Sequence, residues 1–583
     1  MSDHEQEFSL KNLFVPLTTF KAIHIIVILG FIVFGNMLFN GFVWDDKTYI
    51  IFNTDIHSLD FLKLLGKNLF NAGGQYRPIP AIYFATLYSI FKETPFFYHL
   101  FQLILHITNA SMVFILFKRF INARLSLFLA LVFLVHPIQV ESVSYIAASV
   151  NPLFFLFGIS ALLLSLKETI YPKRLIMIFT LLFLSLLTKE AGILFFWLIF
   201  LSVTILKKRL KSREVITFII IGFITIVVYF LIRFSIGGIY FMSLPYHPIA
   251  RLSLGERLLN IPAIIFYYVR TFFFPVQLAI DQEWTIKNLN FQTFYSPLLI
   301  DCSVFLLLGL LGFFLFQKHS MKLKPYLFFV LWFLAGLGMY AQIFPLDATV
   351  ADRWFYFPLV GLLGLLGLFI QSFKFSNEKI RALGLVVGLI IIIVLSFRTI
   401  VRNANWSNAI SLYSHDRQIH DNFDIENNLG TEYAAINEYR HAIEHQTRSI
   451  TMFANEANLY NLANIYERMG NKSTAEKYYT EALNAKNYLP INHSHFAVTY
   501  VRLAYLLYLK SDFNKAKIVA KRGLLDYPDN GYLSIELAAS EYKLGNYQSA
   551  LAAVEKARTL SLNEQINSIY LQIKNKQTVD VKL

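Results

Sequence analysis

Two adjacent carboxylates, Asp45 and Asp46, directly follow the first long apolar stretch of the chain, in the sequence FVWDDKTYI. Two neighbouring carboxylates do not both ionise easily when they are buried, so the pKa of one is raised toward the range that suits a general base. The pair could also bind a divalent cation, or lie in a solvated turn. Because no second acidic cluster demands a metal ion, proton transfer is the chemistry that we expect, and no metal site or cofactor is predicted.

Fixed positive charges stand at the ends of other apolar stretches. Arg77 follows Tyr76 in GGQYRPIP, Lys189 lies in LLTKEAG, Arg270 interrupts the stretch 259–280, and Arg353 lies in ADRWFYFP. Guanidinium groups match the oxygens of a phosphate, so these four side chains are candidate phosphate ligands. The sequence has neither GxxxxGK[ST] nor a GxGxxG that opens a helix, which argues against a nucleotide-driven pump and against a dinucleotide enzyme.

A second set of polar residues borders the same stretches and could support such a site. Each member has a plain structural interpretation as well: a lone histidine beside an apolar segment is usually packed and hydrogen-bonded, and Lys189 and its neighbour could form a structural ion pair. The histidines lack the HExxH spacing of a zinc site. The supporting candidates are His136, Glu141, Glu190, Asp352 and Tyr356.

The elements that position these residues must be membrane helices. Of the 583 residues, 56% are hydrophobic and only 15% are charged, whereas soluble domains have roughly 25% charged residues. The single cysteine, Cys302, excludes an intrachain disulfide and a CxxC motif. Eleven apolar segments approach the ~20 residues that span a bilayer, and we predict spans at 22–40, 96–117, 125–145, 150–166, 175–188, 190–206, 214–234, 298–316, 325–343, 354–372 and 382–397.

The basic residues predict the orientation of these helices. Residues 1–400 hold 32 Lys+Arg against 19 Asp+Glu, so +13 of the net charge of +14 lies there. Seventeen of these basic residues fall in five short links, and links of this kind face the cytoplasm. The segment 1–21 is then cytoplasmic, and the loops 41–95 and 235–297 lie outside with everything after residue 398. The surplus is thus an orientation signal, and no nucleic-acid partner is expected.

The segment 259–280 is long and apolar, but counting it as a span would place two basic links on the outer side. It also contains Pro262, Arg270 and Pro275. We predict a re-entrant or interfacial helix on the outer side, with a tilted twelfth span as the alternative.

The last third of the chain has a different organisation. After a linker helix at 398–422, small residues recur about every 34 positions between 423 and 565, which is typical of four tetratricopeptide repeats. The second helices of these repeats carry Ala442, Ala475, Ala516 and Ala550. A long turn near Pro490 accounts for one wider spacing. We expect the repeats to bind a protein, and residues 566–583 to form a frayed tail.

The order of these motifs resembles a known family. WDD after the first span, YRP, a histidine-rich second span, HPxxxES, TKE and ADRWFYFP precede the repeats. This order resembles the multi-span GT-C glycosyltransferases of the TMTC type, the transmembrane and tetratricopeptide-repeat protein O-mannosyltransferases, and their bacterial relatives. The resemblance covers most of the chain and implies an all-α fold: a polytopic membrane helix bundle of about eleven spans followed by an α-solenoid.

The resemblance also implies an activity. A sugar, mannose or similar, would move with inversion from a polyprenyl-phosphate donor to a hydroxyl on an exported protein acceptor. The enzyme would lie among the lipids of a bacterial inner (plasma) membrane, with its repeats on the extracytoplasmic side. Asp45, favoured over Asp46, would be the base, and Arg77, Lys189, Arg270 and Arg353 would bind the donor phosphate.

One departure from the family pattern concerns the residues after HPxxxE. The pattern there usually includes an Arg and then Asp or Asn, in a W-I-x-x-R-x-D arrangement, whereas this chain has Tyr145-Ile146, then Ser149 and Asn151. If the missing arginine binds donor phosphate in the family, that role falls here to Arg77, Arg270 or Arg353, or the activity is altered.

Two other classes of function compete with the enzyme. A non-catalytic membrane scaffold would use the repeats to recruit partners, and a transporter of a lipid-linked sugar would use charges within the membrane. Transporters tend to contain two similar halves, and residues 1–400 show no such repeat. The polar residues also gather at one end of the predicted spans, which favours transfer chemistry.

Overall fold

The computed structural model describes residues 17–67, 76–168, 171–206, 212–237, 247–318, 320–373, 377–485, 494–560 and 564–579. Most of the predicted N-terminal segment 1–21 and the turn predicted near Pro490 lie outside these residues. The chain divides into two compact units, Met1–Ile419 and His420–Leu583, and each is described by itself.

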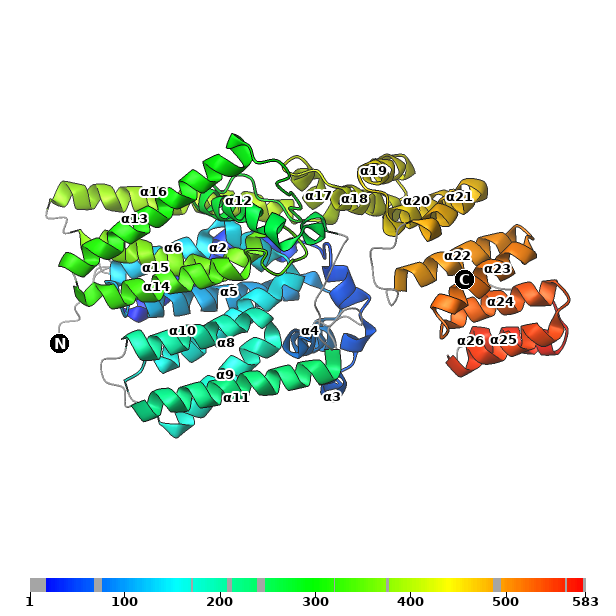
Figure 1. The fold of residues 1–583 in the computed structure, drawn as a ribbon, viewed down its shortest axis with the longest axis horizontal. Coiled ribbons are helices and arrows are strands. Elements are labelled where there is room, and N and C mark those ends of the chain that lie inside the picture. Colours follow the sequence, from blue (N-terminus) through cyan, green and yellow to red (C-terminus); the bar gives the residue numbers. More distant parts are fainter. Residues whose placement is uncertain are drawn as a thin grey trace, which may run out of the picture. The chain divides into compact units, whose positions relative to one another are not determined.

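The first unit is a bundle of helices (Figure 1). Its α-helices are α2 (Thr19–Phe34), α3 (Phe61–Leu65), α4 (Pro78–Phe91), α5 (Pro95–Phe117), α6 (Ala123–Val135), α7 (Val140–Ser144), α8 (Val150–Ser165), α9 (Pro172–Thr188), α10 (Ile193–Leu201), α11 (Ser212–Gly237), α12 (Leu254–Phe273), α13 (Ser296–Lys318), α14 (Ser320–Met339), α15 (Tyr356–Ser372), α16 (Glu378–Asn405) and α17 (Ala409–Arg417). Short 3₁₀ and π turns join them: η1 (Gly35–Phe39), η2 (Lys47–Ile51), η3 (Thr54–His57), η4 (Pro137–Gln139), η5 (Ile146–Ser149), η6 (Glu190–Gly192), η7 (Ser202–Leu206), η8 (Pro248–Arg251), η9 (Phe291–Tyr295) and η10 (Asp352–Phe355).

The predicted polytopic membrane bundle is confirmed, although its span count differs from the eleven expected. Within the described ranges, eight helices are long and apolar enough to cross a membrane, or nine if the pair Ala123–Val135 and Pro137–Ser144, bent by 50°, is one span. The two segments expected at 175–188 and 190–206 are separate helices, as predicted, because the chain leaves the helix at Lys189, whose backbone is extended. Both are shorter than the eight helices that could span. They become α9 and the run Glu190–Leu206.

Polar side chains on α5 donate hydrogen bonds to backbone carbonyls at the ends of α6 and α7, where the helices break. The positions 99, 102, 106 and 109 follow the spacing of a single helix face, and all four side chains are fully buried. Gln102 Nε2 donates to the carbonyls of Ser142 (3.0 Å) and Tyr145 (3.3 Å), and His106 Nε2 donates to that of Leu134 (2.9 Å). A non-helical backbone at membrane depth requires such partners, so α5 stabilises the irregular segment 136–149.

The segment 259–280 is helical only as far as Phe273 and belongs to α12. This helix begins with a capping box, in which Ser253 and Glu256 bond each other's backbone N–H. Its buried residues share one face, at positions 260, 264, 267, 268 and 271, while Leu254 and Leu258 are exposed. α12 is not among the described helices that meet the criteria for a span, and its place at the membrane interface stays a prediction.

No separate helix begins at residue 398, where a linker was expected. Instead, α16 runs on to Asn405 and is fixed to α17 by a buried ion pair, in which Arg402 Nη1 lies 2.6 Å from Asp416 Oδ1. Asp416 Oδ2 also accepts the N–H of Ile280 at 2.8 Å. Residues up to Ile419 therefore belong to the first unit.

The second unit consists of consecutive helix pairs, as the repeat spacing predicts. The helices are α18 (Phe423–Ala435), α19 (Tyr439–Met452), α20 (Glu456–Arg468), α21 (Lys472–Asn484), α22 (Ser494–Leu509), α23 (Phe513–Asp526), α24 (Gly531–Lys543), α25 (Tyr547–Leu560) and α26 (Glu564–Lys574). The four predicted alanines of the second helices are fully buried. Gly470 and Gly545 both have φ of +80°, the left-handed conformation that glycine adopts readily at the end of a helix.

The frayed tail predicted at 566–583 is wrong for the residues up to 579. Residues 564–574 form α26, and its isoleucines Ile566, Ile569 and Ile573 join the core of the preceding repeats. The carbonyl of Val579 accepts the Tyr508 hydroxyl at 3.3 Å. The apolar spacing of a short amphipathic helix thus outweighs the polar ending KNKQTVDVKL, because the last repeat would otherwise expose its apolar face.

Candidate active site

Asp45 and Asp46 lie in different environments although they are adjacent in sequence. Asp46 is fully buried: Oδ1 accepts the N–H of Ala147 at 2.7 Å, and Oδ2 accepts that of Val43 at 3.1 Å. Asp45 is partly exposed, and its Oδ2 accepts the hydroxyl of Tyr145 at 2.8 Å. Asp46 therefore binds its loop to η5, the segment after α7, through the N–H of Ala147. Asp45 is the more exposed of the two carboxylates and is the one that a substrate can reach.

Burial raises the pKa of both carboxyl groups. For Asp46 the pKa rises to about 8, against the lowering effect of the N–H groups of Ala147 and Val43. For Asp45 burial also raises the pKa, while the Tyr145 hydroxyl and the cation of Arg353 lower it. A raised pKa makes a carboxylate more basic, which is what a general base requires.

The backbone before the pair is held in an uncommon conformation. Trp44 has φ of +51°, which is unfavourable for a bulky side chain and persists only where several contacts enforce it. Its ring stacks on Tyr145 with the centroids 5.1 Å apart, and the guanidinium of Arg353 lies 5.6 Å from its centroid. These contacts fix the direction in which Asp45 leaves the loop.

Arg353 lies beside this loop, over the ring of Trp44. It forms a buried ion pair with Glu141 through Nη1, and its backbone N–H donates to Glu141 Oε2 at 2.9 Å. Nη2 lies 3.5 Å from Asp347 Oδ2. Glu141 thus positions Arg353, as a supporting residue would, and Asp347 is a further carboxylate that the sequence did not single out.

A second group of charges gathers around Glu190. Its Oε2 accepts Arg77 Nη2 at 2.8 Å and Nε at 3.1 Å, and its Oε1 accepts Arg233 Nη1 at 2.6 Å. Lys189 Nζ donates to Asn151 Oδ1 at 2.7 Å. Burial, followed by the nearby cations Arg77 and Arg353, lowers the pKa of Lys189 to about 7. Two stacked rings join the groups: Lys189 Nζ lies 5.6 Å from the centroid of Tyr340, Tyr340 stacks on Trp354 at 5.0 Å, and the Arg353 guanidinium lies 5.7 Å from the centroid of Trp354.

The structure brings together seven of the predicted residues, and the other four lie elsewhere. Arg270 contacts the ring of Tyr267 at 5.8 Å, and in the described part of the chain no hydrogen bond or ion pair joins it to Asp45 or Arg353. Asp352 Oδ1 accepts the Tyr267 hydroxyl at 2.5 Å. The buried ring of His136 forms a hydrogen bond with the carbonyl of Phe272. The buried hydroxyl of Tyr356 forms hydrogen bonds with His106 and Asn109. These side chains hold helices together.

Four residues of the site were not predicted in this role by the sequence: Tyr145, Asn151, Arg233 and Asp347. Tyr145 and Asn151 lie in the family pattern after HPxxxE, and they contact Asp45 and Lys189, respectively. Arg233 could have been found from the sequence, because an arginine near the end of an apolar span marks a functional position by default.

The repeats contain a separate pocket of about 280 Å³ with both polar and apolar walls. Its lining comes from α21, α22 and α23: Glu476, Thr480, Leu483, Asn484, Tyr500, Leu503, Leu507, Lys515, Ile518, Val519 and Arg522. A pocket of this kind can accept a protruding side chain of a protein partner.

Comparison with known proteins supports both parts of the chain. The tetratricopeptide repeat family matches residues 457–488. A protein O-mannosyl-transferase of Caenorhabditis elegans is 24% identical over 447 residues, covering 70% of this chain and 59% of that protein. Protein O-mannosyl-transferase TMTC3 of Mus musculus is 31% identical over 152 residues, covering 25% and 16%, and the Homo sapiens protein of that name is 31% identical over 151 residues, covering 24% and 16%. These names confirm the resemblance seen in the motif order.

The chain thus spans 59% of the length of the first of these relatives and 16% of the other two. Among solved structures, the crystal structure of the APC/C hetero-tetramer Cut9-Hcn1 matches at 12% identity, covering 85% of this chain and 89% of that chain, with a TM-score of 0.26. That likeness is too weak to support an argument.

Proposed function

We propose that this membrane protein is a glycosyltransferase that moves a sugar from a polyprenyl-phosphate donor to a hydroxyl group of a protein. The observation that carries the proposal is the partly exposed carboxylate of Asp45 next to Trp44, on which Arg353 lies, with Trp354 and Tyr340 linking Arg353 to Lys189. A base beside several fixed cations suits a reaction in which a hydroxyl attacks and a phosphate leaves. The names of the relatives support the same reaction class.

The proposed reaction is a single inverting displacement. The acceptor oxygen attacks the anomeric carbon while Asp45 takes its proton, and the bond between that carbon and the phosphate oxygen breaks. The Tyr145 hydroxyl holds the carboxylate in place. Arg353, Lys189 and Arg77 stabilise the negative charge that grows on the leaving phosphate. We assign no step to Arg270, Asp352, His136 or Tyr356.

In this proposal the repeats hold the acceptor protein. Arrays of helix pairs present extended surfaces for protein binding and are suited to docking. The pocket between α21 and α23 offers both signs of charge, from Glu476 and from Lys515 and Arg522, beside apolar walls. The acceptor segment bound there would be a polar peptide with one apolar anchor.

Replacing Asp45 tests the base. In Asp45→Asn the amide oxygen can still accept the Tyr145 hydroxyl, so the loop should fold while the base is lost. We expect transfer from a polyprenyl-phosphate sugar by the purified protein to fall by about 10²- to 10⁴-fold, the usual contribution of general base catalysis.

Asp55→Asn is the matched control. Asp55 lies in the same loop and binds Lys63 and Lys67 at 2.8 and 3.1 Å, away from the proposed chemistry, so this variant should keep its activity within about twofold. Unchanged transfer by Asp45→Asn would refute the role of Asp45. Absence of transfer by the wild-type protein with every polyprenyl-phosphate sugar supplied would favour the scaffold.

A further inference from the structure

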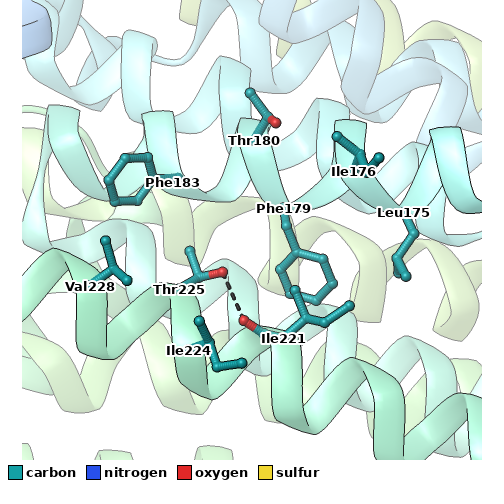
Figure 2. A pocket seen from close by; sticks show the side chains of 9 residues that line it. All are labelled: Leu175, Ile176, Phe179, Thr180, Phe183, Ile221, Ile224, Thr225 and Val228. Atoms are coloured by element: carbon teal, nitrogen blue, oxygen red, sulfur yellow. Dashed lines mark hydrogen bonds between the residues drawn. The ribbon is translucent and has the colours of Figure 1, made fainter.

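The hollow of about 370 Å³ between α9 and α11 (Figure 2) is too apolar to bind a sugar ring. Two of its nine lining residues, Thr180 and Thr225, carry a hydroxyl, and that of Thr225 donates to the carbonyl of Ile221 at 2.8 Å. Sugar hydroxyls need strong hydrogen-bond acceptors, and an ionised carboxylate offers two oxygens that only accept. An exposed carboxylate beside the proposed phosphate ligands, that of Asp347, meets this need.

Asp347 lies on the loop between α14 and η10, and a glutamine fixes the shape of this loop. Gln342 is fully buried and has φ of +59°, a conformation that persists in a residue other than glycine only where contacts enforce it. Its Nε2 donates to the carbonyls of Ala348 and Thr349 at 2.7 and 3.0 Å, and its Oε1 accepts the N–H of Leu346 at 3.0 Å. One side chain thus holds the backbone on both sides of Asp347.

Further contacts anchor the same loop to the rest of the first unit. The N–H of Thr349 donates to the carbonyl of Gln282 at 2.9 Å. Arg257 on α12 donates through Nε to the carbonyl of Gln342 at 2.9 Å and through Nη2 to that of Ile343 at 3.1 Å. A loop held in this way presents its side chains in fixed positions, which lowers the entropic cost of binding a ligand.

The carboxylate of Asp347 is not needed to neutralise or to hold Arg353. The Arg353 guanidinium already forms a buried ion pair with Glu141, and it lies 5.6 and 5.7 Å from the ring centroids of Trp44 and Trp354. Asp347 approaches it only to 3.5 Å, and its side chain is 54% exposed. Within the described ranges, no other residue donates a hydrogen bond to this carboxylate, so its oxygens are open to a ligand.

Asp347 lies near both parts of the candidate site, since its charge is among the influences on the pKa of Asp45 and on that of Lys189. In a displacement, the anomeric carbon would lie between the base and the phosphate ligands. We propose that Asp347 accepts hydrogen bonds from ring hydroxyls of the donor sugar and thereby selects neutral hexoses whose hydroxyls face it. This inference rests on the proposed function and names the residue that recognises the sugar.

A double-mutant cycle between the protein and the donor tests the assignment. The donors are a polyprenyl-phosphate hexose and the set of its deoxy forms, each lacking one ring hydroxyl. Asp347→Ala should lower kcat/KM for the complete donor by about 10- to 100-fold, the usual effect of losing a hydrogen bond to a charged group. For the deoxy donor that lacks the bound hydroxyl, the wild-type protein should already show this loss, and Asp347→Ala should change kcat/KM by less than about twofold.

Ile343→Ala is the matched control on the same loop. The Ile343 side chain is 48% exposed, and its backbone carbonyl, which binds Arg257, is unchanged by the substitution. This variant should transfer sugar from every donor within about twofold of the wild type.

The outcomes separate this inference from the proposed function. If the wild-type protein transfers sugar and Asp347→Ala slows every deoxy donor by the same factor as the complete one, Asp347 only positions Arg353, and the proposed function stands. Unchanged transfer from the complete donor by Asp347→Ala would also refute the assignment. If the wild-type protein transfers sugar from no donor, the proposed function fails and the role of Asp347 fails with it.

Discussion

Lys189 is a residue whose charge changes near neutral pH because of its surroundings. Its pKa falls from the ordinary value of 10.5 to about 7 because of burial and of the cations Arg77 and Arg353. The ammonium form is therefore fully present only below about pH 7, and it is lost as the pH rises through that value. If this charge holds the donor phosphate, the KM for the donor should rise between pH 6 and pH 8.

The test is the dependence of donor KM on pH in Lys189→Arg. A guanidinium stays charged over this range, so the KM should become nearly independent of pH, while Lys189→Gln should give a high KM at every pH. A steep rise that persists in Lys189→Arg would show that another group titrates. The same shift makes the protein more stable as the pH rises from about 7 toward 10.5, because the unfolded lysine binds the proton more tightly there.

At the residue level, the sequence predicted the pair of aspartates and most of the cations, but it did not predict the contacts that give each residue its role. The resemblance to the family favours Asp45, and contacts distinguish the two: Asp46 accepts the N–H groups of Ala147 and Val43, whereas Asp45 accepts the Tyr145 hydroxyl. The roles of Tyr145 and Asn151 depend on contacts across 100 and 38 residues, which no local pattern encodes. Arg270 was predicted by charge alone, and its direction on α12 is set by packing.

The polar face of α5 is the element that supports the irregular backbone behind Asp45. Gln102→Met keeps the size of the side chain but removes the donor to the carbonyls of Ser142 and Tyr145. A buried carbonyl left without a partner costs about 1–3 kcal/mol, so we expect a clear loss of thermal stability. Transfer should also fall, because the Tyr145 side chain orients Asp45.

Thr108→Val is the control on the same helix, because the Thr108 hydroxyl donates only to its own helix, to Ile104 O at 2.7 Å. Thermal unfolding in detergent, followed by intrinsic fluorescence, compares the two variants. Equal midpoints for Gln102→Met and Thr108→Val would show that water or other groups satisfy these carbonyls.

At the level of elements, periodicity predicted most helices because membrane helices are long and apolar. It also placed the break between the apolar segments 175–188 and 190–206 where the structure has it, since α9 ends at Thr188 and the backbone is extended at Lys189. It missed α26, whose three buried isoleucines were outweighed in the sequence by the polar ending. This error arises where packing against neighbouring elements decides the local structure.

The orientation of the whole molecule in the membrane follows from the number of crossings. With nine spans and a cytoplasmic N-terminus, the chain at Ile419 lies outside, where the repeats would meet exported proteins. If α9 and the run Glu190–Leu206 also cross, they add two spans and leave this side unchanged. If α12 crosses, the count becomes even and the repeats lie in the cytoplasm.

A reporter fusion tests the predicted orientation of nine spans with a cytoplasmic N-terminus. A phosphatase that folds only outside the cytoplasm, fused after Ile419, should be active, and the same enzyme inserted in the basic link 207–213 should be inactive. Activity in the link with none after Ile419 would invert the topology, and the candidate site at Asp45 would then face the cytoplasm.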